Sequence, residues 1–191
     1  PDPIGQLNLA GANTTSLRVG TGVTNPVTRD PAVLASSLAS LSAETDGRVL
    51  CGIGRGDSSL AHIGKGNAST AQLRTFIERL RGYLNGEPVD RDGHSSQLRW
   101  LDSYDTHPVP IDIACTGPKT IQMAVEVGDR ISFAVGSAPE RLQWAIETAE
   151  THNEIQPGLQ HPILSFLVKD KCHKCENLFE TEVPAFEKVD F

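Results

Sequence analysis

The chain has 191 residues, 38% of them hydrophobic and 21% charged, which is the composition of one globular domain with a sizeable core. Its formal net charge of −7 argues against a nucleic-acid-binding protein, which needs a basic face, and against attraction to an anionic membrane surface. No run of about 18 apolar residues occurs, so we expect no transmembrane helix.

Four apolar runs rich in Val and Ile predict β-strands, and several of them lack a strict alternation of apolar and polar residues. That pattern is typical of parallel strands buried on both faces. The runs cover residues 17–23, 48–54, 110–117 and 130–136, and residues 161–168 are a candidate fifth strand.

Helical patterns lie between these runs, and each begins with residues that favour a helix N-terminus: an Asp–Pro pair, a capping box or a proline. Glycines end three of the helices. The residues are Asp30–Pro31 with Gly47, Ser69 and Gln72 with Gly86, Pro118 with Gly128, and Ser137 with Glu140. The alternation predicts right-handed βαβ units and a parallel sheet, and we interpret residues 87–107 as an irregular insertion.

The rhythm is lost in residues 152–191, so we place a domain boundary after residue 151. The tail carries a CHKC motif at 172–175 that could supply zinc ligands, but a closed structural site needs four, and we predict no metal site. Cys51 and Cys115 lie in apolar runs and are predicted to be buried thiols. Since no disulfide framework is evident, a reducing cytoplasm is the expected location.

Ligands of parallel α/β folds bind at the carboxyl ends of the strands, and all four predicted strands end in Gly-rich or small polar sequences. In GIGRGD, Gly52 and Gly54 fit a dinucleotide fingerprint, but its third glycine would fall on Asp57, so that reading fails. Asp57 is instead a candidate proton carrier or hydrogen-bond acceptor. The alternative is a solvated loop aspartate that caps the next segment.

Two other strand ends also carry candidate binding residues. In CTGPKT, Thr116, Gly117 and Thr120 surround a helix start and Lys119 adds positive charge, which favours an anion site. The alternative is an ordinary helix that begins with proline. In GTGVTNP, the segment 22–25 has the composition of a tight turn or a strained peptide.

In this order, the motifs resemble the luciferase-like monooxygenase family, which includes bacterial luciferase and oxidoreductases that depend on the deazaflavin coenzyme F420. The resemblance covers roughly residues 15–150. The resemblance rests on the segments LRVGTGVTNPVTRDPAVLASSLASL, GRVLCGIGRGDSSLAHIG, PVPIDIACTGPKTIQMAVEVGDRISFAVG and the PERLQWAIETA helix. It implies a (β/α)8 TIM-type barrel, incomplete here at about four to five βα units, with a flavin or deazaflavin at the barrel mouth.

The resemblance also implies a role for each candidate residue. A non-proline cis peptide would fall at Gly22–Val23, behind the cofactor ring, and Asn25 matches a position that contacts the cofactor. Asp57 matches a glutamate that transfers a proton in members that oxidise sugar phosphates. Contacts on the phosphate side of the cofactor would come from Thr116, Gly117, Lys119 and Thr120.

The implied function is hydride transfer to or from F420, with FMN as the alternative cofactor, on a small-molecule substrate. A homodimer is one oligomeric state to test, and no nucleic-acid or membrane partner is expected. We further expect Asp57 and Gly117 to share one rim, because both follow parallel strands. Two other classes stay open: a non-catalytic remnant that binds a flavin or a protein partner, and a small metal-binding module in the tail.

Overall fold

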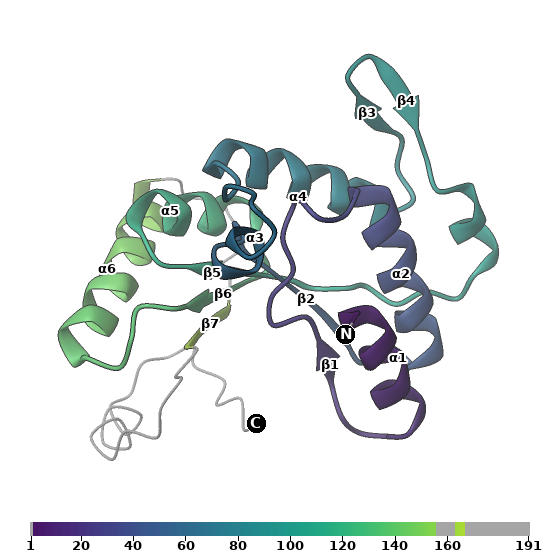
Figure 1. The fold of residues 1–191 in the computed structure, drawn as a ribbon, viewed down its shortest axis with the longest axis horizontal. Coiled ribbons are helices and arrows are strands. Elements are labelled where there is room, and N and C mark those ends of the chain that lie inside the picture. Colours follow the sequence, from purple (N-terminus) through teal and green to yellow (C-terminus); the bar gives the residue numbers. More distant parts are fainter. Residues whose placement is uncertain (1, 156–162, 167–191) are drawn as a thin grey trace. The chain divides into compact units, whose positions relative to one another are not determined.

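The computed structural model describes residues 2–155 and 163–166, and the fold falls into two units, Pro1–Ile111 and Asp112–Phe191. In each unit parallel strands alternate with helices, as the ribbon in Figure 1 shows. The predicted α/β class is therefore confirmed.

The first unit contains a parallel pair of strands, with Val19 opposite Val49, and helices that precede, connect and follow them. Helices α2 and α4 pack against each other through leucine-rich faces, and Leu34, Leu38 and Leu73 are fully buried. The elements are α1 (Pro3–Ala12), β1 (Val19–Gly20), α2 (Pro31–Glu44), β2 (Val49–Ile53), α3 (Ser58–Ala61) and α4 (Thr70–Leu84).

The second unit contains three parallel strands in the order β5-β6-β7, and α5 and α6 connect them. The register places Ile131 of β6 opposite Ile113 of β5 and Leu164 of β7. The candidate fifth strand is therefore confirmed. The elements are β5 (Ile111–Cys115), α5 (Pro118–Val127), β6 (Arg130–Phe133), α6 (Pro139–Ile155) and β7 (Ile163–Phe166).

The helix starts follow the predicted caps in three of four cases. The Asp30 carboxylate accepts the Ala32 N–H, and the capping box at the start of α4 is complete. Pro118 is the first residue of α5. Helix α6 begins one residue later than a Ser137 cap predicts, because the Leu142 N–H donates to the Ala138 carbonyl.

Residues 87–107 correct the prediction of an irregular insertion. They form a hairpin of β3 (Val89–Arg91) and β4 (His94–Ser96), followed by the 3-10 helix η1 (Arg99–Ser103). Asp92 and Gly93 make the turn with positive φ values of 57° and 91°. An Asp–Gly pair is a strong local hairpin signal, so the sequence did hold this information.

Helix α1 was also not predicted, although Asp2 and Pro3 repeat the Asp–Pro start seen at α2. No helix in the described ranges is both long and apolar enough to span a membrane. Cys51 and Cys115 are buried thiols, as predicted. No cluster of three or more potential metal ligands occurs among the described residues, and the CHKC motif lies outside them.

Candidate functional site

The segment that follows β1 is hydrogen-bonded to β2 on both sides of the Gly22–Val23 peptide bond. The Thr21 hydroxyl donates to the Gly52 carbonyl at 2.6 Å, and the Thr24 N–H donates to the same oxygen at 2.9 Å. The Gly54 N–H returns a bond to the Thr24 carbonyl at 2.9 Å. Between these anchors the Gly22–Val23 peptide is cis, which confirms the predicted geometry.

Gly52 and Gly22 in this region have different surroundings. A Cβ on Gly52 would lie 2.0 Å from the Thr21 carbonyl oxygen, so the protein's own backbone excludes a side chain there. A Cβ on Gly22 would meet nothing within 4 Å. The neighbouring Val23 side chain is 45% exposed. The surface over Gly22–Val23 is therefore open and apolar.

Asn25 is buried, and its side chain shapes the turn that leads to α2. Its Oδ1 accepts the Val27 N–H and the Thr28 N–H, both at 3.0 Å, and the Thr28 hydroxyl at 3.2 Å. This oxygen is fully used by the turn. Any contact of Asn25 with a ligand would therefore have to come from the carboxamide nitrogen.

Asp57 lies exposed at the start of α3, after the Gly-rich end of β2. It occupies the cap position but makes no capping bond; its Oδ1 instead accepts the Asn67 side-chain N–H at 3.0 Å. Gly56 has φ +78°, and a Cβ there would come within 2.8 Å of the Asn25 Cβ. The structure thus brings the Asp57 segment beside Asn25, whereas the role of Asn67 was missed by the sequence reasoning.

The start of α5 carries the second set of candidate residues. Thr116 and Lys119 are exposed, whereas Thr120 is only 6% exposed. The Thr120 and Ile121 N–H groups donate to the Gly117 carbonyl at 3.1 and 3.0 Å, and Pro118 has no N–H. The helix start therefore offers the Lys119 N–H and ammonium and the Thr116 hydroxyl to an anion, and fewer free amides than expected.

Gly117 itself leaves open space at this helix start. A Cβ there would meet nothing within 4 Å, and its φ of −138° suits any residue. Neither packing nor backbone conformation within the protein therefore requires glycine at this position. Close approach of a ligand to the backbone is a reason that fits.

A buried carboxylate lies at the opposite, amino end of β5 and was not predicted from the sequence. Asp112 Oδ2 accepts the Ser132 hydroxyl at 2.7 Å, whereas Oδ1 has no partner among the described residues. Burial raises the pKa of Asp112, and the Ser132 hydrogen bond and the Arg130 charge oppose that shift. Since Gly117 follows the other end of the strand, Asp112 is not part of the anion site.

Comparison with known proteins shows a family match over most of the chain. The family described as luciferase-like monooxygenase matches residues 1–165. A 5,10-methylenetetrahydromethanopterin reductase of Methanolobus tindarius is 35% identical over 150 residues, which cover 76% of this chain and 45% of that protein. An F420-dependent hydroxymycolic acid dehydrogenase of Mycobacterium tuberculosis is 34% identical over 131 residues, which cover 64% and 36%.

Solved structures show the same fold at lower sequence identity. The F420-dependent tetrahydromethanopterin reductase of Methanopyrus kandleri has a TM-score of 0.71 at 21% identity, covering 87% of this chain and 53% of that one. An FMN complex of the oxygenating constituent of 3,6-diketocamphane monooxygenase from Pseudomonas putida has a TM-score of 0.68 at 15% identity, covering 87% and 51%. This likeness confirms the predicted barrel-type fold. The chain spans less than half the length of the two curated relatives above.

Asp57 and Gly117 belong to different units. Their position on a common rim stays a prediction, as does the domain boundary after residue 151. The candidate site residues are thus described as two groups, one at the ends of β1 and β2 and one at the start of α5.

Proposed function

The chain belongs to the luciferase-like monooxygenase family, and from this premise we propose that it is, or is part of, an oxidoreductase that uses coenzyme F420 on a small-molecule substrate. Support for F420 comes from relatives named as F420-dependent dehydrogenases, which share about a third of their aligned residues with this chain. FMN is the alternative cofactor, because a structural neighbour carries it.

The observation that carries the proposal is the open backbone at Gly22 and Gly117. At each position a Cβ would meet nothing within 4 Å, although both glycines follow parallel strands at their carboxyl ends, where ligands of such folds bind. The open backbone at Gly22 in the first unit suits a flat ring, and the open backbone at Gly117 in the second unit suits an anionic group. Gly22, Val23 and the Asn25 amide nitrogen would hold the ring. Thr116, Gly117 and Lys119 would hold the phosphate.

The chemistry that F420 supplies when bound is two-electron hydride transfer. The protein positions the substrate and accepts the proton that the substrate loses. The Asn67 amide donates to Oδ1 of Asp57, which leaves Oδ2 to take a proton from a substrate hydroxyl. Because Asp57 is exposed here, the substrate itself would have to exclude water from this carboxylate.

The phosphate would be held by local donors, since the chain carries a net charge of −7 and long-range attraction cannot help. Lys119 is the charged donor at the start of α5, where the helix dipole also favours an anion. Thr120 was predicted as a fourth contact, and its burial makes it the weakest member of that set. Its hydroxyl would need to become accessible on binding.

The test is a titration of the purified chain with F420 and with FMN, followed by absorbance, for the wild type and two variants. Lys119→Ala should weaken F420 binding about ten- to a hundredfold, because a charge-assisted hydrogen bond is lost. Arg141→Ala removes an exposed cation from α6 of the same unit and should change little.

Three other outcomes have distinct meanings. Equal affinities for wild type and Lys119→Ala would show that the phosphate does not bind at the start of α5. Tighter binding of FMN than of F420 would indicate that FMN is the cofactor. Binding without turnover of any alcohol or sugar phosphate would favour the non-catalytic remnant.

A further inference from the structure

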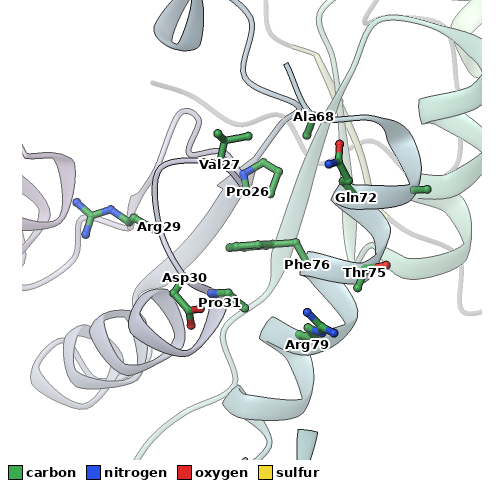
Figure 2. A pocket seen from close by; sticks show the side chains of 11 residues that line it. Pro26, Val27, Arg29, Asp30, Pro31, Ala68, Gln72, Thr75, Phe76 and Arg79 are labelled. Atoms are coloured by element: carbon green, nitrogen blue, oxygen red, sulfur yellow. The ribbon is translucent and has the colours of Figure 1, made fainter. Parts of the chain in front are cut away.

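A groove of about 460 Å³ lies in the first unit, between the loop that enters α2 and the first turns of α4. Figure 2 shows its lining: Pro26 to Pro31 come from the loop, and Ala68 to Arg79 from the opposite wall. None of the candidate cofactor residues lines it. The groove is therefore a feature that the proposed function does not use.

The floor of the groove is flat and apolar. The Phe76 ring points from α4 toward Pro26 and Pro31, as Figure 2 shows, and it is 6% exposed. Ala71 is exposed on the same wall of the groove. An aromatic or other flat apolar group would cover this floor.

The charged groups of the groove are arranged so that an arginine can exchange its carboxylate partner for a bound anion. Asp30 is already neutralised by Arg91 of the hairpin, whose two amino groups reach its carboxylate oxygens at 2.6 and 3.0 Å. Arg79, by contrast, pairs at 2.8 Å with Asp92, whose side chain is 88% exposed. Ion pairs with so exposed a partner contribute little, so another anion can replace Asp92.

Arg29 repeats this arrangement at another edge of the groove. Its guanidinium pairs with the carboxylate of Asp2, which is 57% exposed. Both arginines of the groove are thus held by exposed carboxylates, whereas the groove's own acidic residue is tied to a third arginine. The lining is complementary to an anion.

We propose that this groove binds a small aromatic anion, with the ring over Phe76 and a phosphate or carboxylate on Arg79 in place of Asp92. The site would be separate from the cofactor site. Its affinity would come from the apolar floor together with the guanidinium of Arg79, which then no longer pairs with Asp92.

The test is an NMR titration of the full chain with phenyl phosphate, in parallel with inorganic phosphate and with benzyl alcohol. Phenyl phosphate should bind more tightly than either of the other probes and shift amide signals of residues 27–30 and 68–79. Arg79→Gln should weaken its binding about tenfold, through loss of a charge-assisted hydrogen bond. Arg74→Gln, on the same helix but outside the lining, is the matched control and should not.

Two further variants make the experiment decisive. Asp92→Asn should tighten binding several-fold because it frees Arg79, and an Asn–Gly pair keeps the hairpin turn. Ala71→Leu should abolish binding by filling the groove on a helix surface that tolerates leucine. Equal binding by wild type, Arg79→Gln and Asp92→Asn, or shifts confined to other residues, would overturn the proposal. The cofactor titration does not depend on this result.

Discussion

The two glycines at the ends of α5 have opposite surroundings. Gly117 at the N-terminus faces open space, whereas a Cβ on Gly128 at the C-terminus would lie 2.8 Å from the Ala124 carbonyl oxygen and 2.9 Å from Ile113 Cδ1. Only the second glycine is required by the packing of the protein. The pair therefore separates a structural glycine from one that a ligand would require.

We expect Gly117→Ala to fold normally and to bind the cofactor more weakly. Its unfolding free energy should stay within about 1 kcal/mol of wild type, since the φ is compatible with alanine. Gly128→Ala, the matched control, should lose about 1–3 kcal/mol through overpacking. Chemical denaturation and a cofactor titration of both variants check this. Unchanged affinity in Gly117→Ala would contradict a ligand at that helix start.

Asp112 should make stability depend on pH in an unusual direction. Burial raises its pKa in the folded state above the ordinary 3.8, so the folded chain holds this proton more tightly than the unfolded chain. The contribution of Asp112 to stability therefore falls as pH rises from about 4 through the folded pKa. Asp112→Asn lacks this titration.

The expected result is that Asp112→Asn gains stability relative to wild type as the pH is raised from about 4. Urea denaturation of both proteins at a series of pH values measures the difference. A difference that is constant with pH would show that Asp112 is ionised in the folded chain with an ordinary pKa.

At the scale of elements, the β3–β4 hairpin is tied to the helices by ion pairs. Arg91 forms a bidentate pair with Asp30, the cap of α2, and also donates to the Tyr83 hydroxyl at 3.4 Å. Arg79 of α4 pairs with Asp92 at the turn. The insertion thus fixes the loop that follows the candidate ring site.

Arg91→Met should loosen the hairpin and cost about 0.2–1 kcal/mol of stability, since both partners are partly exposed. Arg91 lowers the pKa of Asp30 below its ordinary value. The stabilisation is therefore present above pH 3.8 and is lost as pH falls through the folded pKa. Hydrogen exchange of residues 89–96 and denaturation at neutral and acid pH test both points. A cost that persists in acid would mean that the ion pair is not its source.

The capping box of α4 gives a second prediction for an element. Ser69 Oγ accepts the Gln72 N–H at 3.1 Å, and Gln72 Oε1 accepts the Ser69 N–H at 2.8 Å. Ser69→Ala should lose about 1 kcal/mol of unfolding free energy. Ser40→Ala, at an exposed position inside α2, should be neutral or slightly stabilising. Similar values for the two variants in thermal denaturation would argue against the cap.

At the scale of the whole molecule, the net charge of −7 predicts that nucleic acid is not a partner of this chain. Binding to duplex DNA depends on basic side chains that displace counterions, and it is strongest at low salt. We expect no retardation of a duplex by this chain in an electrophoretic mobility assay at about 50 mM salt, where such binding is favoured. A shift that disappears as salt is raised would contradict this and reveal a basic face.

Sequence patterns were enough to predict the five parallel strands and the main helices between them, because those elements follow from local patterns, whereas α1 and the β3–β4 hairpin were missed. Asp30 and Ser69 cap their helices by bonds to residues two or three positions away, and such bonds can be recognised from neighbouring letters. The hairpin turn at Asp92–Gly93 was equally local and could have been predicted. The cis peptide at Gly22–Val23 was predicted from the family resemblance.

Which residues are accessible and what each one contacts became known from the folded structure. Asn25 gives its oxygen to its own turn, Thr120 is buried, and Asp57 is held by Asn67 ten positions away. Gly52 is glycine because Thr21, distant in the chain, lies against it. These facts depend on which segments meet after folding. A sequence pattern specifies the type of an element, but burial and side-chain partners arise from the packing of elements that lie far apart in the chain.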